Sequence, residues 1–211
     1  NDRIIIAAWR FDGTGGDPGS SEGIFMVSDR GRARGSFPSV PTRVVAAPAA
    51  MPVLKTAGTR LAMAYLSDLP EICCLPSLMF RTGRPGHWTT TTVAREAAGP
   101  SLRLDAQGRP RIAYATDRGI RYASAGTTTG SFSVTRLPGT SAADGPLALA
   151  LDSGDRPSIA WMHVATPDTI RYTAHDGSWP SPTTVARAPT FTEVVGIAFD
   201  GSDTPHILAV G

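Results

Sequence analysis

The sequence of 211 residues lacks the clustered basic residues that mark nucleic-acid-binding proteins. Lysine occurs once, at Lys55, and the remaining positive charge is carried by scattered arginines, with a formal net charge of +2. A protein that follows a phosphate backbone gathers its basic residues on one face or stripe. The densest group here is Arg30, Arg32 and Arg34, which we interpret as a solvated turn. No nucleic-acid partner is therefore expected.

Long apolar runs are also lacking. The longest, such as Leu147 to Leu151, have the length of a β-strand and fall far short of the about 20 residues that a transmembrane helix needs. We therefore expect no membrane span. The hydrophobic fraction of 41% is nevertheless sufficient for a globular protein with a sizeable core.

Asparagine is nearly absent as well, since Asn1 is the single example, and cysteine occurs only at Cys73 and Cys74. The scarcity of both lysine and asparagine is typical of a GC-rich bacterial genome. The given chain starts without methionine or a signal peptide, which indicates a processed mature chain or an internal fragment. We infer a secreted or cell-surface location.

The sequence does contain a repeat, which predicts the fold. Three clear copies span residues 100–114, 146–161 and 195–209, and a weaker copy spans 52–65. Each clear copy is an alternating apolar run, an Asp/Gly turn, an Arg-Pro or Thr-Pro step and a second apolar run. This is the pattern of a β-hairpin, in which proline stands at the first residue of the second strand.

A third and a fourth strand follow the hairpin. Third strands are predicted at residues 119–124 and 169–174, and fourth strands open at 131–132 and 178–179. Two columns share the period: the second-strand position falls at Trp9, Tyr65, Tyr114, Trp161 and Ala209, in steps of 56, 49, 47 and 48, and the fourth-strand aromatic at Phe37, Trp88, Phe132 and Trp179, in steps of 51, 44 and 47. Four-stranded repeats of this length predict an all-β fold, a β-propeller of four-stranded antiparallel blades.

The repeats divide one propeller domain, residues 1–211, at blade breaks near 51, 99, 145 and 194. The chain then holds strands two to four of one blade, three complete blades, and strands one and two of another, about four and a half blades. Residues 195–199 would close a ring beside residues 3–9, leaving 204–210 as a surplus strand. The simpler alternative is part of a larger ring, with the remaining blades supplied by missing chain or by a partner chain.

Degenerate turn motifs precede the fourth-strand aromatics, at residues 174–179, 28–31 and 82–88. They resemble the Asp-box (BNR-type) motif of sialidase-like propellers, and the repetitive blade plan resembles lectin-like bacterial propellers. The resemblance implies either a carbohydrate-binding protein or part of a sialidase-like glycoside hydrolase. Arg121-Tyr122 and Arg171-Tyr172 offer residue types of a sialidase site, but they occupy one column. We therefore interpret the arginine stems as packing groups and the tyrosines as part of the core between blades.

Two segments depart from the repeat, and such departures are where function is expected. The first, residues 10–23, carries Asp12, Asp17 and Glu22 among glycines and serines, and is either a calcium-binding loop or a flexible insertion. The second, residues 67–77, contains Cys73 and Cys74, which are buried thiols, form a strained vicinal disulfide, or pair outside the chain.

Both segments join a second strand to a third, so we expect them on the same rim of the propeller. They predict a binding surface with the equivalent turns of the later blades, formed by Arg10, Asp12, Asp17, Asp68, Glu71, Cys73, Cys74, Asp117, Arg118, His163 and Asp168. No catalytic residue is assigned and no cofactor other than calcium is considered. We expect a non-catalytic, lectin-like propeller with a carbohydrate ligand. The alternatives are part of a glycoside hydrolase and a structural or protein-binding propeller.

Overall fold

The computed structural model describes residues 5–10, 23–28, 42–46, 49–67, 76–84, 86–190 and 193–211. These residues form β-strands joined by turns, and within each sheet strands that follow one another in the chain pair in the antiparallel sense. Within these ranges no helix has the length and apolar character that crossing a bilayer requires. The predicted all-β class is confirmed.

The described strands form five sheets, which we number as blades in chain order. Blade 1 consists of β1 (Ile5–Arg10), β2 (Gly23–Ser28) and β3 (Thr42–Ala46). Blade 2 consists of β4 (Ala49–Ala57), β5 (Arg60–Ser67), β6 (Ser77–Arg84) and β7 (His87–Ala94). Blade 3 consists of β8 (Ala98–Leu104), β9 (Pro110–Thr116), β10 (Gly119–Ala125) and β11 (Phe132–Arg136). Blade 4 consists of β12 (Asp144–Leu151), β13 (Pro157–His163), β14 (Asp168–Ala174) and β15 (Thr183–Ala188). Blade 5 consists of β16 (Glu193–Phe199) and β17 (Pro205–Val210).

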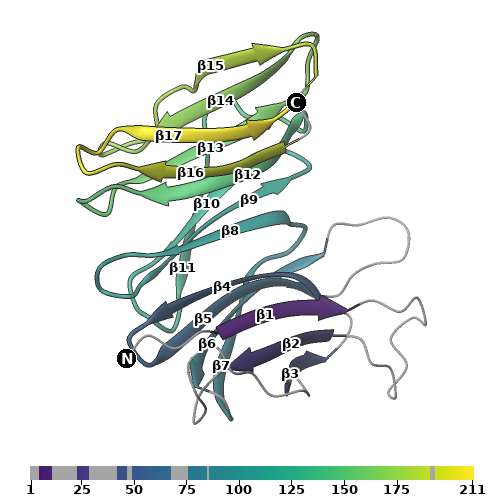
Figure 1. Cartoon of the computed structure of the whole chain (residues 1–211), viewed down its shortest axis with the longest axis vertical. Helices are drawn as coiled ribbons and strands as arrows, with labels where there is room; N and C mark the ends of the chain where they lie inside the picture. Colours follow the sequence, from purple (N-terminus) through teal and green to yellow (C-terminus); the bar gives the residue numbers. More distant parts are fainter. Residues whose placement is uncertain are drawn as a thin grey trace.

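The blades follow one another through the molecule in chain order, from the purple β1 to the yellow β17 (Figure 1). Their first strands lie side by side, since β4 contacts β8, β8 contacts β12, and β12 contacts β16. The apolar clusters lie between neighbouring blades and draw side chains from both. Four-stranded antiparallel sheets that stack face to face along their inner strands are the blades of a β-propeller, and the predicted fold is confirmed.

The two outer blades have the strands that the repeat predicts. Blade 1 contains the equivalents of strands two to four, and blade 5 those of strands one and two. Among the described strands β1 pairs only with β2, and β16 pairs only with β17. The closing arrangement, in which residues 195–199 would complete blade 1, is therefore not formed in this structure.

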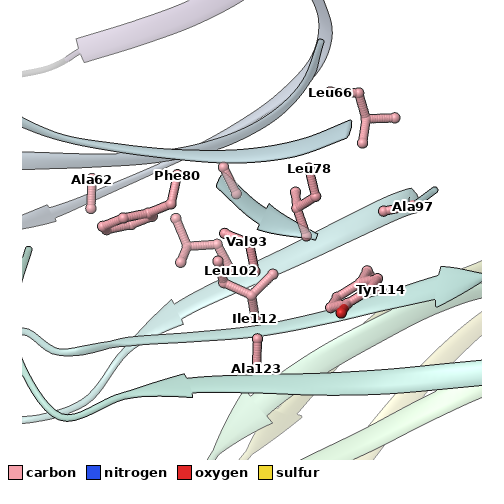
Figure 2. Close-up of a cluster of buried hydrophobic side chains, with 11 residues drawn as sticks. Ala62, Leu66, Leu78, Phe80, Val93, Ala97, Leu102, Ile112, Tyr114 and Ala123 are labelled. Carbon is pink, nitrogen blue, oxygen red and sulfur yellow. The ribbon is translucent and has the colours of Figure 1, made fainter. Parts of the chain in front are cut away.

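The alternation of side chains along each strand directs them into two different gaps between blades. On β10, Tyr122 belongs to the cluster between blades 3 and 4, whereas Ala123 belongs to the cluster between blades 2 and 3. Figure 2 shows the second cluster, with Phe80 from blade 2 and Ile112 and Tyr114 from blade 3. Burying such a side chain completely contributes about 1.5–3 kcal/mol to the stability of the fold. The apolar clusters in the gaps therefore hold neighbouring blades together.

An aspartate organises the turn between the first and second strands of blades 3, 4 and 5. In blade 3, Asp105 Oδ1 accepts hydrogen bonds from the backbone N–H groups of Gln107 and Arg109 at 3.0 and 2.8 Å, and Oδ2 accepts from Arg109 Nε at 2.7 Å. Asp152 and Asp200 accept the equivalent backbone bonds in the next two blades. The aspartate that opens each repeated turn therefore accepts hydrogen bonds from the backbone N–H groups of that turn through its side chain.

The same turns link one blade to the next. Both carboxylate oxygens of Asp155, in blade 4, accept from the backbone N–H of Ala106 in blade 3, at 3.0 and 3.1 Å. One repeat later, Asp203 accepts from the backbone N–H of Ser153 at 2.9 Å and from its hydroxyl at 2.5 Å. Both aspartates adopt positive φ angles, of 62° and 58°. These bonds hold the registry between neighbouring blades along one rim.

Blade 3 has a glycine at the position of these linking aspartates. Gly108 has a φ of 74°, and a Cβ added there would lie 3.2 Å from the Cβ of Ala57 in blade 2. The turn of blade 2 is shorter, so the two turns approach closely and leave little room for a side chain. The glycine therefore preserves the packing of blade 3 on blade 2.

The fourth strand of blade 4 differs from the prediction. The sequence pattern opens it at Ser178–Trp179, whereas β15 begins at Thr183. Pro180 and Pro182 have no N–H group to donate to a sheet, which delays the start of the strand. Trp179 consequently lies in the connection between β14 and β15, at the entrance to a gap between two blades.

Candidate functional site

A hollow of about 560 Å³ lies in the gap between blades 3 and 4, next to Trp179. One wall comes from β9, β10 and β11 of blade 3, and the other from the turn before β13 and the connection between β14 and β15. We call it the indole hollow. The lining side chains that matter for its chemistry are Arg111, Tyr122, Ser124, Asp155, His175 and Trp179.

Aromatic side chains form the inner part of the indole hollow. The ring of Trp179 lies 5.1 Å from that of Tyr122, at an interplanar angle of 66°, and 5.1 Å from the imidazole of His175, at 69°. Edge-to-face contacts of this kind favour a defined orientation of the rings. Tyr122 is buried, whereas Trp179 is half-buried. A partly exposed indole is thus held in place at the wall of a cavity.

The gap between blades 2 and 3 shows what normally occupies these positions. There the equivalents of Tyr122 and Trp179 are Phe80 and Phe132, whose rings meet edge to face at 5.4 Å and 77°. The space beside these two rings is filled, since a Cβ added to Gly130 would lie 2.7 Å from the Phe132 ring and 3.3 Å from the Phe80 ring. At the equivalent positions beside the indole hollow, the apolar pair is therefore replaced by two aromatic residues that carry polar atoms.

Charged groups on the walls of the indole hollow are held by the protein. The guanidinium of Arg111 donates from one nitrogen to Asp105 Oδ2 at 2.8 Å and from another to the carbonyl of Ala125 at 3.3 Å. Asp155 is fixed through its bonds to the backbone of Ala106. Polar groups that are already oriented lose little conformational entropy when a ligand binds.

The electrostatics of the hollow keep the Tyr122 hydroxyl protonated. Burial raises the pKa of Tyr122 to about 12, the charge of Arg111 opposes this rise, and that of Asp105 adds to it. Burial alone would also raise the pKa of Asp105, but the hydrogen bonds from Arg109 and the charges of Arg111 and Arg109 lower that pKa below its usual value. At neutral pH the phenol remains able to donate a hydrogen bond, beside an ionised carboxylate and a guanidinium.

The chemistry of the indole hollow is suited to binding. Its described lining includes one carboxylate, that of Asp155. Hydrolysis of a glycosidic bond usually uses a pair of carboxyl groups on either side of the scissile bond. No group of three metal-ligating side chains occurs among the residues that the structure describes.

Most of the predicted site residues cannot be placed. The predicted residues outside the described ranges are Asp12, Asp17, Glu22, Asp68, Glu71, Cys73 and Cys74. Arg10 ends β1, but only its backbone is described. The calcium loop and the vicinal disulfide therefore stay predictions.

The other four predicted residues lie in two neighbouring turns. Asp117 and Arg118, between β9 and β10, form an exposed ion pair at 3.7 Å and line a second hollow of about 360 Å³ between blades 2 and 3. In blade 4, His163 Nδ1 lies 2.8 Å from Asp144 Oδ1, and Asp168 accepts from the backbone N–H of Ala165 at 2.9 Å. The structure therefore brings Asp117 and Arg118 together, whereas His163 and Asp168 bond within their own blade.

The sequence analysis does not predict a binding site at the indole hollow. The sequence predicts Tyr122 in the core between blades, which the structure confirms, and Trp179 at the opening of a fourth strand, which β15 does not include. The signal in the sequence was a difference between equivalent positions of successive repeats. The Phe80–Phe132 pair of one gap is replaced by Tyr122 and Trp179 in the next. Recognising it requires knowing that the third strand of one blade faces the fourth strand of the following blade.

No protein-family model matches the chain, and no curated protein matches it. Among solved structures, it is similar to an alpha-L-arabinofuranosidase from Clostridium thermocellum, with a TM-score of 0.50 and 17% identity over 71% of this chain and 60% of that one. It is also similar to a mutant of AofleA from Arthrobotrys oligospora, with a TM-score of 0.49 and 14% identity over 87% of this chain and 57% of that one. A bifunctional GH43-CE protein of Bacteroides eggerthii gives a TM-score of 0.46 and 12% identity, over 75% and 22% of the two chains. At this identity, the likeness to the arabinofuranosidase shows a common fold, and the chain spans 60% of that protein.

Proposed function

We propose that this propeller binds a carbohydrate, and that a sugar ring enters the indole hollow between blades 3 and 4. The observation that carries the proposal is the replacement of the apolar Phe80–Phe132 pair by Tyr122 and Trp179, two aromatic residues with polar atoms, next to a cavity. A sugar ring has apolar C–H groups on its faces and hydroxyls around its rim. An indole provides apolar contact for the face, while fixed charged and hydroxyl groups bind the rim.

The polar groups around Trp179 match the needs of a polyhydroxylated ligand. Arg111 offers donors, Asp155 offers acceptors, and Ser124 and the protonated Tyr122 offer both. The volume of about 560 Å³ lies within the usual range for small-ligand sites. Similarity to a carbohydrate-active enzyme raises the expectation of a sugar ligand only through the shared fold.

Binding without catalysis is the form of the proposal that the indole hollow favours, because its described lining offers one carboxylate where a glycosidase usually uses two. The competing function is glycoside hydrolysis. An assay of the full-length protein with fluorogenic glycosides separates the two, since turnover above the buffer rate would replace our proposal of a lectin-like protein with that of a hydrolase.

A glycan array probed with the fluorescently labelled chain identifies the sugar class, and titration calorimetry with the best hit tests the site. We expect Trp179→Ala to weaken binding at least tenfold, or about 1.4 kcal/mol. Trp88→Ala is the matched control, because Trp88 is the fourth-strand aromatic of blade 2 and lies under the guanidinium of Arg81 at 5.0 Å, away from the indole hollow. Equal losses in the two variants, or no hit on a broad array, would contradict the proposal.

A further inference from the structure

The second hollow, of about 360 Å³, lies in the preceding gap and has a different chemistry. We call it the arginine hollow. It is lined from blade 2 by the end of β7 and the link to blade 3, and from blade 3 by the ends of β9 and β10 and the turn between them. Its charged lining residues are Arg95, Glu96, Asp117, Arg118 and Arg121, three cations against two carboxylates.

Arg121 is the cation whose position calls for a negatively charged partner. It is half-buried, and no carboxylate lies within ion-pair distance of it among the described residues. Directly opposite it across the ladder stands Arg136, whose guanidinium donates to the carbonyl of Thr140 at 2.7 Å. The Arg136 side chain lines the indole hollow and not the arginine hollow, so among the two only Arg121 is placed to contact an anion in the arginine hollow.

Blade 4 shows how the protein satisfies the equivalent arginine elsewhere. Arg171 pairs with Trp161 in the ladder, as Arg121 pairs with Tyr114. The guanidinium of Arg171 donates to the carbonyl of Gly139, in the link between blades 3 and 4, at 3.3 Å. The link between blades 2 and 3 is much shorter, since β7 ends at Ala94 and β8 begins at Ala98, and no equivalent bond to Arg121 forms.

Among the residues that the structure describes, a second oxygen acceptor of blade 4 has no counterpart in blade 3. In blade 4 the carboxylate of Asp144 accepts from Trp161 Nε1 at 2.7 Å. The residue equivalent to Asp144 in blade 3 is Ala97, and the residue equivalent to Trp161 is Tyr114. Burial raises the pKa of the Tyr114 hydroxyl, and the charge of Arg121 opposes the rise, so the phenol stays protonated at neutral pH. At this position blade 3 therefore offers a phenol donor, whereas blade 4 contains both a donor and its carboxylate acceptor.

We propose that the arginine hollow binds an oxyanion, with Arg121 as its inner donor and Arg95 and Arg118 at its mouth. The group is a carboxylate or a sulfate, carried by an acidic saccharide or present as a free inorganic anion. This site is separate from the indole hollow, because Arg121 and Tyr122 are successive residues of β10 and face opposite gaps. The arginine of the Arg-Tyr pair therefore serves one hollow and the tyrosine serves the other.

Titration calorimetry at constant ionic strength tests the proposal with sodium sulfate and sodium glucuronate as probes. For each anion that binds the parent protein, we expect Arg121→Met to lower the affinity at least tenfold. Methionine is chosen because Met79 holds the equivalent position in blade 2. The matched control is Arg171→Met, which removes the same type of side chain from a position outside the hollow, and we expect it to change the affinity by less than twofold. Binding of sulfate as tight as that of glucuronate assigns the site to a free anion, and tighter binding of glucuronate assigns it to an acidic sugar.

Arg118→Gln gives an independent reading, because this side chain is exposed and we expect its replacement to preserve the fold. We expect about threefold weaker anion binding from the loss of one rim charge. Trp179→Ala should leave anion binding unchanged, so failure of the carbohydrate proposal and failure of this one are distinguishable. Absence of binding for both anions, or affinities that Arg121→Met does not alter, would overturn the proposal.

Discussion

Replacing Asp144 should lower the stability of the protein more than replacing an exposed aspartate does. Asp144 is buried, at 3% exposure, at the start of β12. Its Oδ1 accepts from Trp161 Nε1 at 2.7 Å and lies 2.8 Å from His163 Nδ1, and its Oδ2 accepts from the backbone N–H of Ser141 at 2.5 Å. One carboxylate therefore satisfies the first and second strands of blade 4 and the link from blade 3.

The magnitude follows from the groups that are left without a partner. In Asp144→Ala, the indole N–H of Trp161 is fully buried and loses its acceptor, and two further groups lose theirs at partly exposed positions. An unsatisfied buried donor costs about 1–3 kcal/mol, and we expect a total loss of about 2–5 kcal/mol. This is a large fraction of the about 5–15 kcal/mol that stabilises a typical domain.

Urea denaturation at pH 7 measures the loss as a difference in the free energy of unfolding. Asp144→Asn keeps one carbonyl oxygen and should lose about half as much as Asp144→Ala. The control is Asp117→Ala, which removes an exposed ion pair and should change the stability by no more than about 0.5 kcal/mol. If Asp144→Ala stays within about 1 kcal/mol of the parent, the satisfied network is not what stabilises blade 4.

Three further predictions concern the turns and the core. Asp155→Ala removes the link from blade 4 to the backbone of Ala106, and should cost about 1–2 kcal/mol in urea denaturation; an unchanged midpoint would contradict the role of this link. Because the pKa of Asp105 is lowered in the folded state, its contribution is present above the unfolded-state value of about 3.9 and is lost as the pH falls below it. Asp105→Asn should therefore have a lower melting temperature than the parent at pH 7, and the difference between the two melting temperatures should shrink between about pH 4 and 2. A constant difference over that range would refute the lowered pKa of Asp105. Phe80→Ala should lose about 3–5 kcal/mol by opening the cluster of Figure 2, whereas the exposed Val134→Ala should lose much less.

The blade plan was accessible from sequence because its signals are local and repeated. Pro110, Pro157 and Pro205 each begin a second strand, as the repeat predicts. A proline can stand there because its missing N–H is not needed at the first residue of a strand. The aspartates that open the turns are local signals too, since each one bonds to backbone groups two and four residues further along.

Contacts between blades were not accessible in the same way. Asp155 bonds to Ala106 and Asp203 to Ser153, across about one full repeat, and nothing near either aspartate in the sequence identifies its partner. Glycine at position 108 likewise follows from the approach of a turn in another blade. Such positions depend on how the blades stack, which the repeat period alone does not determine.

The candidate sites show the same division. The sequence predicts Asp117 and Arg118 as binding residues from their turn, and both line the arginine hollow, but their binding role stays a prediction. The sequence also drew attention to the Arg-Tyr pair, but could not show that its two members face different gaps. Trp179 was expected in a strand, and the prolines that follow it place it instead at the wall of the indole hollow.

The most direct test of the proposed binding function is a crystal structure of the protein soaked with the strongest saccharide hit from the glycan array. We predict density for one sugar ring against Trp179, between the walls that carry Arg111 and Asp155, in the gap between blades 3 and 4. Density for that sugar only on another surface of the propeller, with the indole hollow left without it, would contradict the proposal.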